Sequence, residues 1–106
     1  MSVPEIREHF EAADVSKVYE TLGLSQAEFS DLIRCSASTV NRWKQGKSQV
    51  DTYGAIVLGM LWWLCVEQVG ARPRCDRSRV VGALMEYRSP ARVVVALAGL
   101  VMEHSR

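Results

Sequence analysis

The residues best suited to chemistry in this chain are polar side chains between positions 25 and 47, several of which can bind nucleic acid. The planar guanidinium of Arg42 matches the O6 and N7 acceptors of guanine, and the amide of Asn41 can pair with adenine. Residues 34–49 contain four cations and no carboxylate, although the whole chain has a net charge of only +1. Since phosphate groups respond to local charge, this basic segment is a candidate surface for a nucleic-acid backbone.

A first helix that would position these side chains is predicted over residues 26–33. Ser25 and Glu28 stand three residues apart, the spacing of a capping box, in which each side chain hydrogen-bonds the backbone amide of the other residue. The apolar residues that follow indicate the buried face of this helix. The inward set is Ala27, Phe29, Leu32 and Ile33, and the outward set is Gln26, Ser30 and Asp31.

A second helix is predicted over residues 37–45. Ser36 can cap it, and Ala37, Val40 and Trp43 recur at three-residue steps, which predicts one inward face. Gly46 suits the left-handed conformation that commonly ends a helix. Because both helices are too short to be stable alone, they must belong to a larger packed domain.

This stretch resembles the helix-turn-helix of the lambda-repressor-like (XRE) family of bacterial and phage transcription regulators. The turn departs from the family pattern, because Arg34 stands where the family normally has glycine. A non-glycine residue with positive φ carries some strain, so this turn is expected to differ in detail. Lys44 replaces the acidic residue that often follows the tryptophan. The resemblance covers about residues 15–60 and rests on Leu22-Gly23-Leu24-Ser25-Gln26, Ser36, Thr39-Val40, Arg42-Trp43 and Gly46.

The resemblance implies an all-α fold, namely a lambda-repressor-like helix-turn-helix domain with a C-terminal helical extension. The domain would occupy residues 1–69, with its motif over 25–46. The extension would occupy residues 70–106 and would serve dimerisation or cover the core. Caps and apolar periodicity predict further helices over 4–12, 15–22, 52–67, 77–87 and 90–104, with a linker over 70–74. The three valines at 93–95 would also suit a strand, but the long apolar run between good caps favours a helix.

The resemblance also implies how the segment would meet DNA, with the second helix in the major groove. The predicted base-reading residues are Ala37, Ser38, Asn41 and Arg42, and the predicted phosphate-binding residues are Ser25, Gln26, Thr39, Lys44 and Lys47. Most have a plainer alternative: a phosphate contact or a surface salt bridge for Arg42, a solvent-facing side chain for Asn41, packing for Ala37, a cap for Ser25, and solvation for the lysines. Trp43 is expected to pack rather than to stack on DNA.

The predicted helix over 52–67 is apolar on every face between Ala55 and Val66, so it must be covered on every side. Either the C-terminal part of the chain or a second subunit can cover it. Trp62-Trp63 can line a ligand pocket, although packing is the preferred interpretation. The candidates for a dimer interface, with an intramolecular core as the alternative, are Leu61, Trp62, Val94, Leu97 and Val101.

Composition argues against several classes of protein. The three cysteines form no CxxC pair, and the two histidines lie at the chain ends, so we expect free thiols, no metal and no cofactor. The apolar run over 53–66 is shorter than the ~17–20 residues of a membrane span, and the acidic N-terminus does not resemble a signal peptide. No Gly-rich phosphate loop or nucleophile–base pattern indicates an enzyme. These features favour a cytoplasmic protein, and the resemblance implies that the cell is bacterial or phage-infected and that the protein is associated with the nucleoid.

The leading hypothesis is a sequence-specific regulator of transcription that binds double-stranded DNA as a homodimer and represses at an inverted-repeat operator. Residues 72–106 carry seven arginines and three carboxylates, which we interpret as a solvated face in preference to a further phosphate contact. The alternative function is an antitoxin-type or other protein-interaction module that binds a partner protein through its C-terminal part. A long exposed apolar patch would favour that alternative.

Overall fold

The computed structural model describes residues 4–105, and within them the chain forms six α-helices, one short π-helix and a two-stranded hairpin. The predicted all-α class is confirmed at this level, as a mostly helical globule with a radius of gyration of 12.8 Å. The elements are α1 (Ala12–Thr21), α2 (Gln26–Leu32), α3 (Ala37–Gln45), α4 (Thr52–Leu61), η1 (Trp62–Val66), β1 (Gln68–Val69), β2 (Arg72–Pro73), α5 (Arg77–Met85) and α6 (Pro90–His104).

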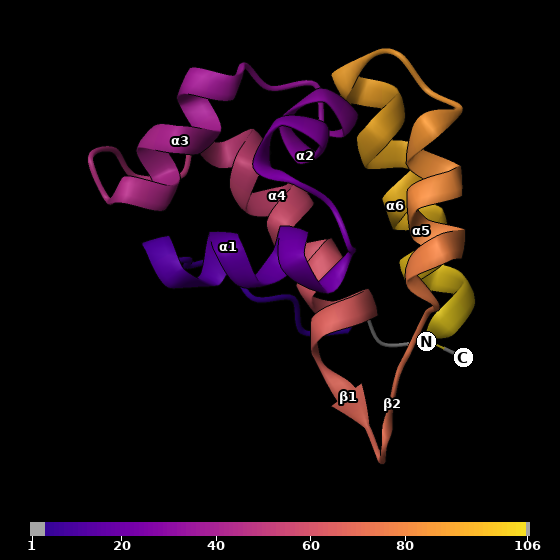
Figure 1. The fold of residues 1–106 in the computed structure, drawn as a ribbon. Helices are drawn as coiled ribbons and strands as arrows, with labels where there is room; N and C mark the ends of the chain where they lie inside the picture. The colour runs from indigo at the N-terminus through magenta and orange to yellow at the C-terminus, as the bar shows by residue number, and fades with distance from the viewer. Residues whose placement is uncertain (1–3, 106) are drawn as a thin grey trace.

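Helix α4 lies near the middle of the molecule, with α1, α2 and α3 on one side and the antiparallel pair α5 and α6 on the other (Figure 1). The hairpin projects from the end of the molecule opposite the α2–α3 turn (Figure 1). One continuous core joins all the α-helices, so the C-terminal extension shares its core with the rest of the chain. The largest fully buried side chains of this core include Phe29, Ile33, Leu58, Leu61, Leu64, Leu84 and Leu97.

The caps of α2 and α3 form as predicted. The Ser25 hydroxyl accepts from the Glu28 amide at 3.1 Å, while the Glu28 carboxylate accepts from the Ser25 amide at 2.9 Å, which completes the capping box. The Ser36 hydroxyl accepts from an amide in the first turn of α3 at 3.2 Å. Gly46 ends that helix with a φ of 72°. Local signals therefore set both boundaries of α3.

Three side chains of this segment do not lie where the periodicity predicts. Ala27 and Ala37 were expected inside and are exposed, whereas Ser30 was expected outside and is buried. Burial of Ser30 is tolerated because its hydroxyl donates to the Ala27 carbonyl at 2.9 Å, so no polar group is left unsatisfied. The buried face of α2 is consequently formed by Phe29, Ser30 and Ile33.

The predicted helix over 4–12 is wrong, because residues 4–11 form no helix. Arg7 instead pairs with Asp14 at 2.7 Å, and its guanidinium lies 4.3 Å from the centre of a Trp62 ring. Asp14 also accepts from the Glu11 amide, so α1 begins at Ala12 rather than at the predicted residue 15. The N-terminal segment passes so close to α4 that a Cβ at Gly59 would overlap the Arg7 carbonyl. These long-range contacts hold the segment extended.

The long apolar stretch over 52–67 forms α4 followed by the π-helix η1 rather than one helix. Asp51 caps it as predicted, accepting from the Gly54 amide at 2.7 Å. The chain itself covers most of α4, with α6 on one side and the N-terminal segment on another, although Ile56 stays 43% exposed. Among residues 4–105, no helix combines the length and hydropathy needed to cross a lipid bilayer.

The C-terminal half differs from prediction mainly before α5. Residues 68–73, which overlap the predicted linker over 70–74, form the hairpin β1–β2, with Gly70 at a φ of 68° in its turn. Asp76 precedes α5 but its side chain accepts from the Ser78 hydroxyl and does not cap the helix. α5 ends at residue 85, two residues before the predicted end at residue 87. α6 runs from 90 to 104 as predicted, so the helical interpretation of the valines is confirmed.

The turn between α2 and α3 is held from two sides. Arg34 occupies the left-handed region with a φ of 61°, the conformation that a glycine would adopt without strain, so the predicted difference in the turn is not seen in this φ angle. Its guanidinium Nη2 donates to the carbonyl of Tyr87, just beyond α5, at 2.8 Å. On the other side, the Tyr53 hydroxyl of α4 donates to the Ile33 carbonyl at 2.8 Å. The extension is thus tethered to the turn that precedes α3.

Two substitutions of Arg34 separate the strain from the tether. Arg34→Ala keeps the left-handed backbone and loses the hydrogen bond to Tyr87, so we expect it to lower the free energy of unfolding by about 1–3 kcal/mol. Arg34→Gly loses the same bond but relieves the strain, so we expect a change within about 1 kcal/mol of the original chain. Urea unfolding followed by circular dichroism measures both, and equal losses in the two variants would contradict the strain argument.

Candidate nucleic-acid interface

Helix α3 is fixed to the core by one apolar stripe and exposes the rest of its surface. Val40 is fully buried and Trp43 is 3% exposed. The Trp43 indole lies over Gly54 in the first turn of α4, where only a glycine leaves room for it. Packing is therefore the role of Trp43 here, as expected. The rest of α3 forms a polar outer face.

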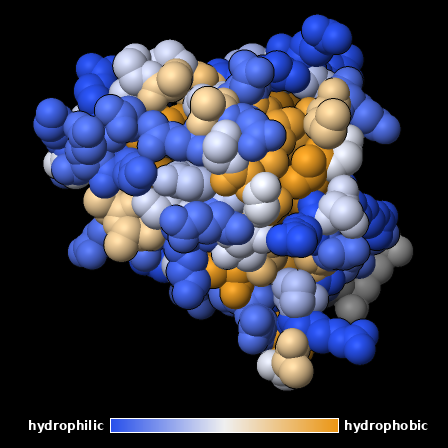
Figure 2. Space-filling model, viewed as in Figure 1, coloured by the Kyte–Doolittle hydropathy of each residue, from blue (hydrophilic) through white to orange (hydrophobic). Residues whose placement is uncertain are grey.

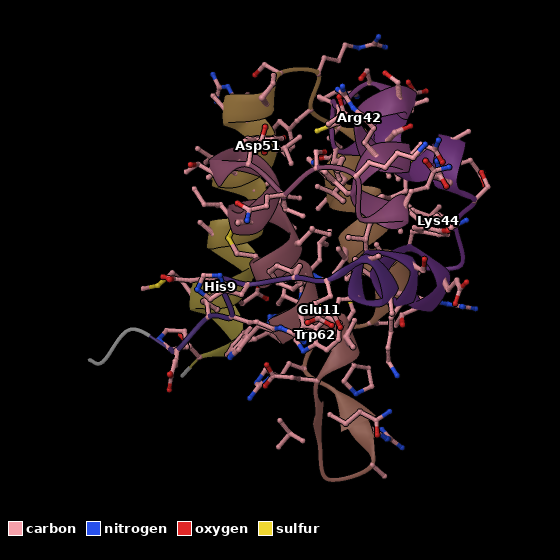
Figure 3. The ribbon with its side chains drawn as sticks, turned by 90° about the vertical axis from the view of Figure 1, so that its left-hand side faces the viewer. His9, Glu11, Arg42, Lys44, Asp51 and Trp62 are labelled. Carbon is pink, nitrogen blue, oxygen red and sulfur yellow. The ribbon has the colours of Figure 1, made fainter. Side chains whose placement is uncertain are left out.

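The predicted base-reading residues share this outer face. Ala37, Ser38 and Arg42 are exposed, and Asn41 is half-buried. Figure 3 views the molecule from the α3 side and shows Arg42 and Lys44 on that helix. Arg42 forms no ion pair with any residue between 4 and 105, so its guanidinium is available to a ligand. The arrangement is compatible with the predicted roles, which stay predictions.

A contact between α2 and α3 connects two residues that were predicted to act separately. Gln26 Nε2 donates to Asn41 Oδ1 at 3.3 Å. Because an amide oxygen accepts two hydrogen bonds, Asn41 keeps one acceptor site and its own amide donors for a base edge. Gln26 therefore orients Asn41 as well as lying at the exposed start of α2. This pairing could not be predicted, since the two residues lie 15 positions apart in the chain.

The other predicted phosphate contacts vary in availability. The Ser25 hydroxyl accepts within its cap and retains its proton for a ligand. Thr39 is half-buried, and its hydroxyl lies 2.6 Å from that of Ser36, so it is engaged within the cap of α3. Lys44 Nζ lies 6.0 Å from the centre of the Tyr19 ring. Lys47 is exposed in the loop after α3, and the surface there is hydrophilic (Figure 2).

Tyr53 was not predicted as part of this interface, yet it supports the turn that aims α3. Burial, followed by the proximity of Cys35, raises the pKa of Tyr53 to about 12, with Asp51 adding to the rise and Arg34 opposing it. The phenol therefore stays protonated and remains a donor to the backbone at neutral pH. Burial also raises the pKa of the half-buried Cys35 thiol, so this cysteine is poorly suited to act as a nucleophile.

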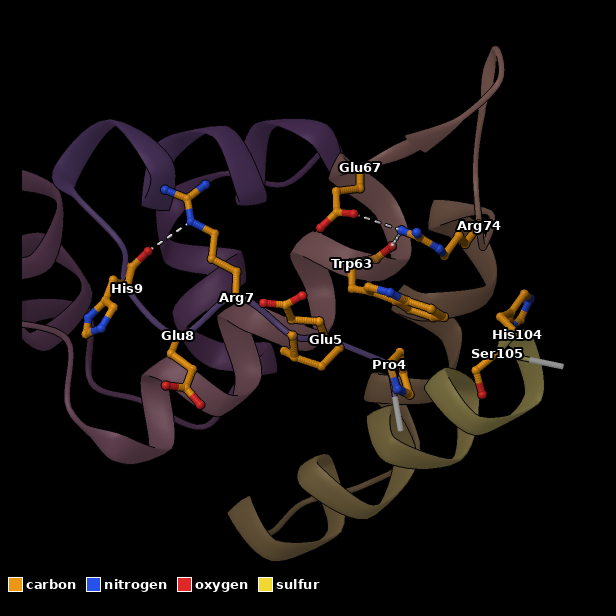
Figure 4. A pocket seen from close by; sticks show the side chains of 11 residues that line it. Pro4, Glu5, Arg7, Glu8, His9, Trp63, Glu67, Arg74, His104 and Ser105 are labelled. Carbon is orange, nitrogen blue, oxygen red and sulfur yellow. Dashed lines mark hydrogen bonds and ion pairs between the residues drawn. The ribbon is translucent and has the colours of Figure 1, made fainter. Parts of the chain in front are cut away.

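The largest cavity lies away from α3, between the N-terminal segment, η1 and the end of α6 (Figure 4). It has a volume of about 1020 Å³ and is open and polar. Arg74 pairs with Glu67 at 3.1 Å and covers the Trp63 ring at 4.2 Å from its centre. The described residues 4–105 contain no group of three potential metal ligands. We assign no chemistry to this cavity.

A second hollow runs between α2 and α5. It encloses about 420 Å³, and Figure 2 shows hydrophobic surface at this junction. Met85 is 67% exposed at its edge. Its lining combines four apolar side chains with four charged ones: Leu24, Leu32, Val81 and Met85, with Glu28, Asp31, Arg34 and Arg88.

The predicted dimer residues are mostly inside the chain's own core. Leu61, Leu97 and Val101 are buried, and Trp62 and Val94 are half-buried. The apolar side chains that α6 does expose are Val95 at 63% and Met102 at 47%. These two were not predicted, although their seven-residue spacing places them on one face of a helix.

Comparison of this chain with protein-family models, with curated protein sequences and with solved structures finds no match.

The contact of Trp43 with Gly54 predicts a strong response to one methyl group. A Cβ at Gly54 would lie 2.6 Å from Trp43 Cη2 and 2.7 Å from Val50 Cγ1, so Gly54→Ala should lower the free energy of unfolding by about 1–3 kcal/mol. Gly82, inside α5, has no atom within 4 Å of such a Cβ. Gly82→Ala should therefore raise stability by about 0.5–1 kcal/mol. Thermal unfolding of both variants tests this, and a neutral Gly54→Ala would contradict it.

Proposed function

We propose that this protein is a sequence-specific regulator that binds double-stranded DNA, with α2 and α3 acting as a lambda-repressor-like helix-turn-helix. The observation that carries the proposal is α3 itself, a helix anchored by Val40 and Trp43 that presents a polar face with an unpaired arginine. A helix anchored in this way can enter a major groove without losing its own packing. The protein would work in a bacterial or phage-infected cytoplasm.

In this proposal Arg42 and Asn41 read base edges, and Ser38 and Ala37 contact bases near the start of α3. Gln26, Ser25 and the exposed start of α2 hold a phosphate, together with Lys44 and Lys47. Thr39 is the weakest member of the set, because its hydroxyl is engaged by Ser36. Repression, rather than activation, rests on the family resemblance.

We further propose that the protein acts as a homodimer on an inverted repeat, with half-sites about 34 Å apart. The exposed apolar residues Val95 and Met102 of α6, next to the half-buried Val94, are the surface that supports this. They replace the buried Leu61, Leu97 and Val101 as candidates. Two-fold symmetry of the protein would then match the symmetry of the operator.

A second function, the binding of a partner protein, is supported by the hollow between α2 and α5. Its apolar wall ends in the exposed Met85, and charged side chains line its rim. Such a groove suits an amphipathic helix of another protein. An antitoxin-type module would use this surface while still binding DNA through α3.

Selection of random DNA duplexes by the purified protein tests the main proposal. We expect an enriched inverted repeat, and Arg42→Ala should abolish the preference for it, a loss of about 1–3 kcal/mol in discrimination. Lys17→Ala, which removes the same charge from an exposed site on α1, should retain the preference. If the original chain enriches no sequence, the DNA-reading proposal fails and the partner-binding function is favoured.

Dimerisation through α6 predicts that Val95→Glu yields monomers, because a buried charge at an apolar interface is strongly unfavourable. Val69→Glu is a matched control, since Val69 is 60% exposed on the hairpin and lies outside α6. Sedimentation equilibrium of the three proteins gives the measurement. Monomeric original protein, or dimers of Val95→Glu as stable as those of the control, would rule out this interface.

A further inference from the structure

We propose that the turn between α5 and α6 is a second contact with the DNA backbone, made by Arg88 and Arg92. This inference rests on the proposed function, and it assigns to the C-terminal extension a direct role in DNA binding. The contact would be made to phosphate groups and would be independent of sequence. It requires that the turn lie beside α3, that its charges be free, and that they be close enough to reach a phosphate.

The position of the turn follows from its link to the α2–α3 turn. Arg34 donates to the Tyr87 carbonyl at 2.8 Å, and Tyr87 immediately precedes Arg88. Figures 1 and 3 both show the α5–α6 turn at the end of the molecule where α3 begins. A duplex seated on the start of α3 would therefore have a backbone on the same side as this turn. The tether fixes the α5–α6 turn to the α2–α3 turn, which leads directly into α3.

The two arginines at this turn are unpaired within the described chain, unlike Arg74 and Arg79 elsewhere in the extension. Arg74 pairs with Glu67, and Arg79 pairs with Glu103 at 2.6 Å. By contrast, Arg88 and Arg92 are exposed and form no ion pair with any residue between 4 and 105. Unpaired arginines bind phosphate without first breaking a salt bridge.

Nearby carboxylates decide which arginine is the stronger contact. Glu28 and Asp31 line the same groove as Arg88, so they reduce the positive potential around it. Arg92 is not among the residues that line that groove and lies in the first turn of α6. Its backbone amide donates to the Ser89 hydroxyl, and its side chain is exposed to solvent. We therefore assign the larger share of the contact to Arg92.

The salt dependence of DNA binding measures this contact. Each phosphate contact contributes about 0.9 to the slope of log affinity against log salt, so removing two should lower the slope by about 1.8. Between about 50 and 200 mM salt, the double variant Arg88→Ala/Arg92→Ala should thus lose about twelvefold less affinity than the original chain. Its sequence preference should be unchanged, because phosphates carry no base information.

The matched control is Arg72→Ala/Arg77→Ala, which removes the same charge from the other end of α5, on β2 and at the helix start. Anisotropy of a labelled duplex gives affinities, and circular dichroism verifies that both variants fold. A slope for Arg88→Ala/Arg92→Ala equal to that of the control would overturn this contact, while loss of preference in Arg42→Ala would still support the proposed function. Absence of binding by the original chain would overturn both.

Discussion

The packing of Trp43 against α4 is the interaction on which the candidate interface depends. The indole is nearly enclosed, and it sits over Gly54, where a Cβ would displace it. Asp51 caps the same turn, so the surface that receives the indole is itself rigid. Because α3 has only Val40 as a second fully buried anchor, its orientation follows from this contact. The contact between Trp43 and Gly54 therefore sets the direction in which the polar residues on the opposite side of α3 point.

The extension stabilises the same region from the other side. An arginine with a left-handed backbone in a turn is strained. The buried Nε of Arg34 has no hydrogen-bond partner among residues 4–105, which adds a further energetic cost at this residue. The hydrogen bond to the Tyr87 carbonyl offsets part of that strain and fixes the turn to the end of α5. Residues 77–104 therefore do more than cover α4. They also hold the start of α3 in place. The C-terminal extension is therefore a structural part of the same packed domain as the helix-turn-helix segment.

Elements with complete local signals were predictable, and those that depend on distant contacts were not. α3 and α6 match prediction because each has a hydroxyl cap, an apolar stripe and a defined end. The helix predicted over residues 4–12 does not form, because Arg7 contacts Asp14 and Trp62, and these contacts exist only in the folded chain. At the candidate site the exposed polar face was foreseeable from periodicity. The Gln26–Asn41 contact and the role of Tyr53 could not be predicted. Apolar periodicity shows which face of a helix is buried, but it does not show which side chains of two helices meet.

The nearly neutral composition hides a strongly uneven distribution of available charge. Several carboxylates are engaged at helix starts, where backbone amides stabilise them: Glu28 and Asp51 accept from amides of α2 and α4 caps. The hydrogen bond from the Ser25 amide lowers the pKa of Glu28, so it remains ionised and bound there. Arg42 and Lys47 have no such partners between residues 4 and 105. Folding thus holds Glu28 and Asp51 in caps and leaves Arg42 and Lys47, unpaired within the described chain, on and beside α3, where a phosphate backbone would encounter positive charge.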